Sequence, residues 1–359
     1  MKQMKVKLED VCERGTSNLK QSDIAKTSGD YPIYGASGYI GNTNFYHQEK
    51  PYVAVVKDGA GVGRAALYPA NSSVIGTMQY LLPKDNVLPK YLFYVVSYMH
   101  LEKYYTGATI PHIYFKDYKN EEFNLDLLER QAEIVEILEK CEKIIEKRKQ
   151  EIQLLDQLIK ARFVEMFGDC DDMVSISDLC SIITDGTHQS PKFQESGIPF
   201  ILVSNLSNNT VTYNTEKYIS EETYNELYKR TPIEKGDLLL STVGSYGHPA
   251  VVTENTRFLF QRHIAYLKPK REVVNSFYLH SALLAPDGQR QIEEKVKGIA
   301  QKTLNLSEIR TIRIPVPEIE EQNAFENFVH QVTKSKVVVQ KALDEAQLLF
   351  DSLMQEYFG

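Results

Sequence analysis

Three short polar segments carry the side chains best suited to bind a ligand or to take part in a reaction. One is a glycine-rich turn at residues 58–64, one is the Asp-Gly-Thr-His sequence at 185–188, and one is the Gln-Arg-His sequence at 261–263. A glycine-rich turn can approach phosphate, an aspartate beside a histidine can transfer protons, and glutamine and arginine can pair with base edges. The candidate functions are therefore nucleotide binding, acid–base catalysis and nucleic-acid recognition.

The glycine-rich turn at 58–64 is followed by residues 65–68, whose composition is typical of a β-strand. A dinucleotide-binding loop must instead open a helix, because the helix N-terminus meets the phosphates. The sequence therefore disfavours a nucleotide site and predicts a tight turn between two strands. A further interpretation brings this turn close to a DNA backbone, with Lys57 and Arg64 as partners of the phosphates.

The pair formed by Asp185 and His188 lacks the context of a known catalytic site. No G-x-S-x-G nucleophile motif accompanies it, and no H-E-x-x-H or second histidine stands at metal-ligand spacing. A polar turn capped by its own side chains is therefore favoured. The chain also lacks a P-loop and the Asn/Asp-Pro-Pro-Tyr/Phe motif of methyltransferases that act on base amino groups. The sequence offers no convincing catalytic constellation.

Composition limits the class of protein further. A length of 359 residues favours two domains over one, and 42% apolar residues suffice for real cores. The net charge of −7 argues mildly against non-specific nucleic-acid binding, although a basic face within a globular region stays open. Four cysteines without C-x-x-C spacing indicate reduced thiols of a cytosolic protein. The N-terminal residues lack a signal peptide, and no apolar run is long enough for a membrane span.

The polar segments must be held in place by larger elements, and the two long charged segments at 126–168 and 318–359 are the candidates. Both carry apolar residues at alternating steps of three and four, which predicts paired coiled-coil helices with Arg148 and Lys336 as the poor fits to the apolar seam. A shift of the numbering by 191 aligns both their Glu-x-Gln starts and their Phe-Gly ends. The match at both ends is stronger than a shared heptad phase and indicates an internal repeat.

The segments before each helix repeat the same order of predicted elements. Strands are predicted at 52–56 and 65–68 and a helix at 89–100 in the first half. In the second half, 237–241 matches the first of these strands and 277–284 matches the helix. A starting element at 6–12 recurs at 174–180, the glycine turn recurs at 243–247, and the polar loop at 107–112 recurs at 297–304. The chain thus reads as domain, helix, domain, helix.

This pattern resembles the specificity (S) subunit of type I restriction–modification systems, over the whole chain. The residues that carry the resemblance lie at 185–188, 197–201 with 205–206, 236–241, 261–265 and 317–322, and in the first half at 31–35 and 129–131. The first half departs from the pattern, because it lacks the Asp-Gly-Thr-His turn and has Met78-Gln79-Tyr80 where the second half has Gln-Arg-His. The DNA contacts of the first half are therefore expected to differ.

The resemblance implies an α+β fold with two similar mixed α/β target recognition domains. Each domain is followed by a long helix, and the two helices pair as an antiparallel coiled coil with pseudo-twofold symmetry. The expected boundaries are 1–125 for the first recognition domain, 126–168 for the spacer helix, 169–317 for the second recognition domain and 318–359 for the second helix.

The resemblance also implies a function without catalysis in this chain. Each recognition domain would read one half of a bipartite DNA target, while the helices set the half-site spacing and dock two modification subunits in the cytoplasm. Those subunits would bind S-adenosylmethionine and methylate adenine, and two restriction subunits using ATP and Mg²⁺ would complete the complex. The alternatives are a coiled-coil adaptor with two protein-binding domains and an enzyme with an undetected site.

The DNA contacts expected from these considerations are basic, histidine, hydroxyl and amide side chains in the predicted turns and loops. Such groups bind phosphates and base edges. In the first half they are Lys57, Arg64 and His112; in the second half they are His188, Lys192, Ser245, Tyr246, Gln261, Arg262 and Lys302.

Overall fold

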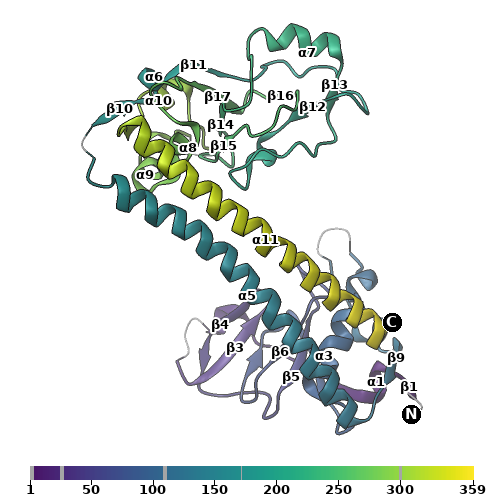
Figure 1. Cartoon of the computed structure of the whole chain (residues 1–359). Coiled ribbons are helices and arrows are strands. Elements are labelled where there is room, and N and C mark those ends of the chain that lie inside the picture. Colours follow the sequence, from purple (N-terminus) through teal and green to yellow (C-terminus); the bar gives the residue numbers. More distant parts are fainter. Residues whose placement is uncertain (1–3, 25–27, 108–110, 171, 299–300) are drawn as a thin grey trace. The chain divides into compact units, whose positions relative to one another are not determined.

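The structure, a computed structural model, describes residues 4–24, 28–107, 111–170, 172–298 and 301–359. The chain forms two compact units (Figure 1). Unit 1 comprises Met1–Lys149 with Lys341–Gly359, and unit 2 comprises Gln150–Gln340. Each unit therefore combines one globular part with portions of two long helices, α5 (Leu128–Phe167) and α11 (Ile319–Phe358).

Unit 1 contains three small sheets and short helices. Its four-stranded sheet has the order β2-β8-β5-β6, its three-stranded sheet has the order β4-β3-β7, and β1 pairs with β9. The strands are β1 (Met4–Lys7), β2 (Cys12–Thr16), β3 (Tyr31–Gly35), β4 (Gly38–Thr43), β5 (Tyr52–Val56), β6 (Ala65–Tyr68), β7 (Ser73–Val74), β8 (Met78–Pro83) and β9 (Glu122–Leu125). The helices of the globular part are α1 (Leu8–Val11), α2 (Gln21–Ile24), α3 (Pro89–Tyr98), the 3-10 turn η1 (Leu101–Tyr104) and α4 (Phe115–Tyr118).

Unit 2 repeats this topology. The order β11-β17-β14-β15 corresponds to the four-stranded sheet, β13-β12-β16 corresponds to the three-stranded sheet, and β10 pairs with β18. The strands are β10 (Met173–Ser175), β11 (Cys180–Asp185), β12 (Ile198–Ile201), β13 (Tyr218–Ile219), β14 (Leu238–Ser241), β15 (Pro249–Val251), β16 (Leu259–Phe260), β17 (Ile264–Pro269) and β18 (Arg313–Pro315). The helices are α6 (Ile176–Leu179), the 3-10 turn η2 (Val203–Leu206), α7 (Glu221–Tyr228), α8 (Ser276–Leu284), α9 (Pro286–Lys295) and α10 (Leu306–Arg310).

In each four-stranded sheet an inner strand, β5 in unit 1 and β14 in unit 2, is buried on both faces. Side chains alternate between the faces of a strand, so Val53 and Val55 of β5 join the core beneath α3, while Ala54 joins the core shared with the three-stranded sheet. In unit 2, Leu238 joins the core with α8, and Leu239 packs with residues of β12 and β16. Burial on both faces explains why these strands are continuous apolar runs in the sequence.

Most predicted elements are confirmed, with differences at their ends. The turn at 58–64 connects β5 and β6, which pair antiparallel. The starting element predicted at 6–12 is instead the end of β1, the one-turn helix α1 and the first residue of β2. The helix predicted to reach His100 ends at Tyr98, because His100 adopts a left-handed conformation with φ of 50°. In the loops predicted at 107–112 and 297–304, residues 108–110 and 299–300 lie outside the described residues.

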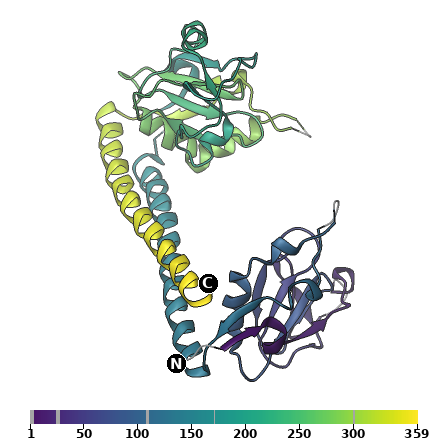
Figure 2. The ribbon, with the colours of Figure 1, turned by 90° about the vertical axis from the view of Figure 1, so that its right-hand side faces the viewer.

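The long helices pair antiparallel within each unit (Figure 1, Figure 2). In unit 1, Ile134 near the start of α5 shares a core with Phe358 at the end of α11. In unit 2, Phe163 near the end of α5 packs against Phe325 near the start of α11, with ring centroids 5.5 Å apart. Lys336, a poor fit to the apolar seam, forms an ion pair with Asp156 of the other helix. The predicted fold class, two similar mixed α/β parts each followed by a long paired helix, is confirmed.

A buried glutamine ties the start of each long helix to its own globular part. Gln131 of α5 accepts a hydrogen bond from the Leu88 backbone N–H at 2.8 Å and donates to the Asn86 carbonyl at 3.0 Å. Gln322 of α11 accepts from the Asn275 N–H at 2.9 Å and donates to the Val273 carbonyl at 3.1 Å. The same junction is thus built twice, and it accounts for the glutamine in the repeated Glu-x-Gln starts.

Candidate nucleic-acid interface

One edge of the four-stranded sheet in unit 2 gathers most of the predicted contact residues. Because the strands run antiparallel, the end of β11 at Asp185, the start of β17 at Ile264, the end of β14 at Ser241 and the start of β15 at Pro249 lie in line. The loops at this edge are 186–188, 261–263 and 242–248. Strands lie about 4.8 Å apart, so these loops form a continuous row. We call this row the loop edge of unit 2.

The Asp-Gly-Thr-His turn holds two cationic or potentially cationic side chains on one carboxylate. Asp185 Oδ2 lies 2.9 Å from His188 Nε2, and Asp185 Oδ1 lies 2.9 Å from Arg230 Nη2. A side chain at Gly186 would place its Cβ 2.2 Å from the Phe260 carbonyl oxygen. The glycine is therefore required by the close approach of the neighbouring chain, and the aspartate orients His188 and Arg230 at the loop edge.

The Gln-Arg-His segment runs beside this turn. Gln261 forms a parallel bridge with Thr187, and the Arg262 backbone N–H donates to the Thr187 carbonyl at 3.2 Å. The Arg262 side chain is exposed. Burial lowers the pKa of the His263 imidazole, and the charge of Arg262 lowers this pKa further. His263 is therefore expected to be neutral at neutral pH, so that the charge of this segment comes from Arg262.

A lysine, a tyrosine and a glutamate meet at the far end of the loop edge. Lys302 Nζ lies 2.9 Å from Glu293 Oε1 and 3.2 Å from the Tyr246 hydroxyl, which donates to Glu293 Oε2. The hydrogen bond from Tyr246 and the pairing with Lys302 lower the pKa of Glu293, whereas Glu293 raises the pKa of Lys302. Ser245 is exposed beside them. The Gly244 N–H donates to the Lys302 carbonyl at 3.3 Å, which joins the 242–248 loop to the segment that contains Lys302.

Unit 1 builds the same edge with different side chains. Lys57 follows β5, Arg64 precedes β6, and His112 bridges to Asp58, just as Thr303 bridges to Val243 in unit 2. The Gly59 N–H donates to the Pro111 carbonyl at 2.9 Å, which joins the glycine turn to the segment just before α4. Arg64 is exposed, and its Nη2 donates to the Ala36 carbonyl.

The structure therefore brings nine of the ten predicted contact residues to the two loop edges, and one lies apart. Lys192 is exposed in the loop between His188 and the Gln194 bridge to β13, beyond the row of strand ends. Sequence reasoning missed Arg230, in the turn after α7, and Glu293 of α9, which both reach the loop edge. It also missed Tyr114, an exposed aromatic ring that lies 5.1 Å from the His112 ring. That these residues contact DNA remains a prediction.

The described residues contain neither a cluster of metal-ligating side chains nor a helix that could cross a membrane. Within 4–24, 28–107, 111–170, 172–298 and 301–359, no three His, Cys, Asp or Glu side chains gather so as to hold a metal ion. Cys12, Cys141 and Cys180 are buried, Cys170 is half-buried, and none of the four is disulfide-bonded in the described residues. No helix in these ranges is long and apolar enough to cross a membrane.

The sequence profile of one protein family, described as the type I restriction modification DNA specificity domain, matches residues 1–155 and again residues 171–346. The chain belongs to this family. Two copies of the specificity domain account for the repeated topology of units 1 and 2, and they disfavour the adaptor interpretation. Membership of this family of specificity domains implies a non-catalytic role for the chain.

Curated relatives carry matching descriptions. The chain is 29% identical over 161 residues to the type I restriction enzyme EcoBI specificity subunit of Escherichia coli, covering 45% of this chain and 34% of that protein. It is 21% identical over 332 residues to the MjaVIII specificity subunit of Methanocaldococcus jannaschii, covering 81% of this chain and 76% of that protein. The first of these alignments thus spans about a third of its relative.

Solved structures share the fold over nearly the whole chain. The S subunit of a type I restriction–modification system from M. genitalium superimposes with a TM-score of 0.60 at 16% identity, covering 100% of this chain and 96% of that one. A chain from a structure that describes the complex assembly and conformational transition of the type I R-M system superimposes with a TM-score of 0.57 at 16% identity. The superposition covers 99% of this chain and 97% of that one. At this identity the likeness concerns the fold.

Proposed function

We propose that the chain is the DNA sequence-specificity subunit of a type I restriction–modification complex, in which each unit reads one half of a bipartite target. The observation that supports this most directly is the loop edge, which is built twice on one topology with different side chains. A repeated scaffold keeps the approach to the duplex constant, whereas different edge residues permit two different half-sites. Residues 1–125 and 169–317 would be the recognition domains.

The long helices are proposed to set the half-site spacing and to dock two modification subunits. Buried contacts hold the helices together, yet large apolar side chains stay exposed on both of them, where a docked subunit would cover them. In unit 1 the exposed residues are Leu128, Ile144, Leu348 and Leu349, and in unit 2 they are Leu154, Leu158, Val164, Val337 and Val338.

Catalysis and cofactors are proposed to reside in the partner subunits. An enzyme that methylates a base within a duplex must extrude it, and the specificity subunit would hold the duplex on both sides. The modification subunits would bind S-adenosylmethionine and methylate adenine, and two restriction subunits would use ATP and Mg²⁺. The complex would work in the cytoplasm, where basic partner surfaces offset the net charge of −7 of this chain.

Lys302 provides a test of phosphate binding at the loop edge of unit 2. We expect Lys302→Gln to weaken DNA binding of the complex on all sequences and to reduce the slope of log K against log salt by about 1. The physical reason is the loss of one cation that releases a counterion on binding. Lys235→Gln is the matched control, because Lys235 is exposed at the opposite edge of the same sheet, before β14. Equal effects of the two variants would contradict the assignment.

The proposal that each recognition domain reads its own half-site independently is tested by exchanging one of the two domains. The full chain is purified with its modification subunits, and its target is selected from a random DNA library. We expect a split motif, and we expect replacement of residues 170–318 by the corresponding segment of another family member to change only one half of it. Each unit has its own core, which is the physical reason for this independence. A change in both halves, or no sequence preference at all, would refute the proposal.

A further inference from the structure

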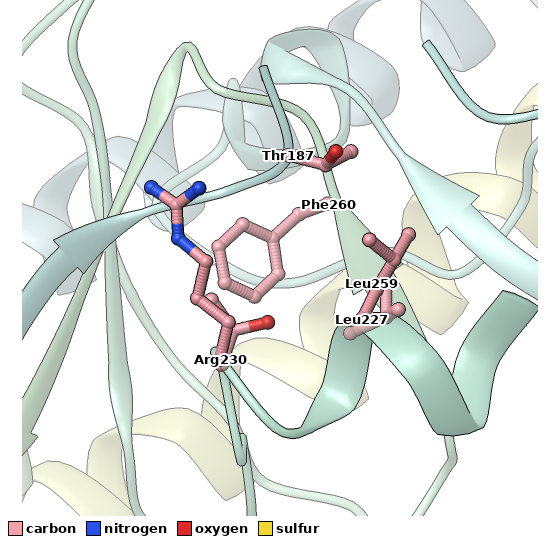
Figure 3. A pocket seen from close by; sticks show the side chains of 6 residues that line it. Thr187, Leu227, Arg230, Leu259 and Phe260 are labelled. Carbon is pink, nitrogen blue, oxygen red and sulfur yellow. The ribbon is translucent and has the colours of Figure 1, made fainter. Parts of the chain in front are cut away.

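A small apolar hollow opens at the loop edge of unit 2, at the junction of its two sheets. It is lined by Thr187, Leu227, Arg230, Thr231, Leu259 and Phe260 (Figure 3). Its volume is about 30 Å³, above the roughly 10–15 Å³ that a cavity needs to hold one water molecule, so a methyl group also fits. The lining is mostly hydrocarbon, so an apolar group is the better occupant.

A guanidinium group stands beside this hollow in a fixed position. Arg230 Nη2 is held by Asp185 Oδ1 at 2.9 Å, and Asp185 is itself only 17% exposed. Figure 3 shows the Arg230 side chain extending past the Phe260 ring at the rim of the hollow. A guanidinium has five N–H donors, and the bond to Asp185 engages one of its nitrogens. Donors therefore remain for an acceptor that lies next to the occupant of the hollow.

Only one of the four bases combines the two features that this arrangement would bind. In the major groove thymine presents the O4 acceptor and, on the adjacent ring carbon, a methyl group. Guanine and adenine present acceptors but no methyl group, and cytosine presents an amino donor that would face the guanidinium donors. The arrangement of a donor beside a methyl-sized apolar hollow is thus complementary to thymine.

We propose that the hollow between Thr187, Leu227 and Phe260 receives the C5-methyl group of a thymine in the half-site read by unit 2, while Arg230 donates to the thymine O4. This inference rests on the proposed function, because it names the base that one part of the loop edge reads. Asp185 is a positioning residue that orients Arg230. His188, held by the other carboxylate oxygen at 2.9 Å, lies beside the same base.

Unit 1 lacks this arrangement. The Asp-Gly-Thr-His turn has no equivalent there, and the strand that corresponds to β16, β7, is followed by Ile75 and Gly76 rather than by a Gln-Arg-His segment. The sequence alignment of Met78-Gln79-Tyr80 with Gln-Arg-His is wrong, because Met78 begins β8, the counterpart of β17, which begins only after His263. The thymine contact is therefore specific to one half of the target. The half-site read by unit 1 then serves as an internal control in every measurement.

The test uses the full chain in complex with its modification subunits and the split target found by library selection. Each thymine of the half-site assigned to unit 2 is replaced singly by uracil, which removes only the methyl group. At one position we expect binding to weaken about three- to fivefold, the effect of one buried methyl group. We expect Leu227→Phe, which fills the hollow, to bind uracil and thymine equally at that position while keeping its preferences in the other half-site.

A second pair of variants tests Arg230. Arg230→Lys keeps the charge but loses the planar donor geometry, so affinity should fall about tenfold and the preference at the same position should relax. Arg257→Lys is the matched control, because Arg257 is 56% exposed against 54% for Arg230 and pairs with Glu221 in the same unit. Its base preferences should not change.

The outcomes separate this inference from the proposed function. A split motif with no thymine in the unit 2 half-site, or one in which no uracil substitution weakens binding, would overturn the thymine contact and leave the specificity function standing. Unchanged base preferences in Arg230→Lys would do the same. Binding without any sequence preference in the unaltered complex would overturn both.

Discussion

Replacing Phe358 by alanine is expected to destabilise unit 1 by about 3–5 kcal/mol, while unit 2 keeps its stability. Phe358 is 6% exposed and belongs to the main core of unit 1, where its ring lies 5.3 Å from the Tyr91 ring. Removal of a buried ring costs both its transfer from water and the cavity that it leaves. A domain is typically stable by only about 5–15 kcal/mol, so the loss is a large fraction of the total.

Hydrogen exchange measured by mass spectrometry separates the two units in this experiment. Protection of α3 should fall in Phe358→Ala, whereas protection of α8 should stay as in the unaltered protein. Leu349→Ala provides the matched control on the same helix, because Leu349 is 53% exposed, and its effect should stay within about 0.5 kcal/mol. Similar losses in both variants would show that the end of α11 does not belong to the core of unit 1.

The long helices and the internal repeat could be predicted because their signals are local and periodic. The heptads and the Glu-x-Gln starts place α5 and α11 correctly to within a few residues. The aligned Phe-Gly ends proved equally informative, since Phe167 lies 4.9 Å from Tyr278 in unit 2 just as Phe358 lies 5.3 Å from Tyr91 in unit 1. A buried aromatic pair at the same place in both units imposes the same residue twice.

The side-chain arrangement of the loop edges could be predicted only in part. Polar residues after β11, before β17 and after β14 mark the edge, because strand ends can be read from the sequence. Their partners cannot be read in this way. Arg230 reaches Asp185 across 45 positions of the chain, and that pairing depends on how α7 packs beside β16. The need for glycine at position 186 is likewise set by the neighbouring Phe260 carbonyl, which only the folded chain brings near.

The functions proposed for the site residues divide in the same way. The position of each loop edge follows from the order of the strands, which the sequence indicates. The base that an edge would bind depends on side-chain packing, such as the hollow beside Arg230, which only the folded chain shows. The division of the chain at 1–125, 126–168, 169–317 and 318–359 remains a prediction about recognition domains and spacer. The compact units divide the chain in another way, because each long helix contributes to the cores of both units.

Replacement of Gln322 by leucine is expected to cost unit 2 about 3 kcal/mol of unfolding free energy. The Gln322 side chain is fully buried, and it makes three hydrogen bonds, with Asn275 N at 2.9 Å, Val273 O at 3.1 Å and Pro317 O at 2.8 Å. Leucine has a similar volume but leaves these three backbone groups without their partner, and an unsatisfied buried polar group costs more than a hydrogen bond contributes.

The measurement is denaturant unfolding followed by hydrogen exchange at the start of α8 and at the start of α11. Gln331→Leu is the control, because Gln331 is exposed on the same helix within unit 2. Gln131→Leu should produce the equivalent loss in unit 1, where the Leu88 N–H and the Asn86 and Asp126 carbonyls bind the glutamine. Equal stability of Gln322→Leu and Gln331→Leu would refute the structural role of this glutamine. A loss in Gln322→Leu with none in Gln131→Leu would mean that only one of the two junctions depends on its glutamine, so the repeated motif would not have a single physical cause.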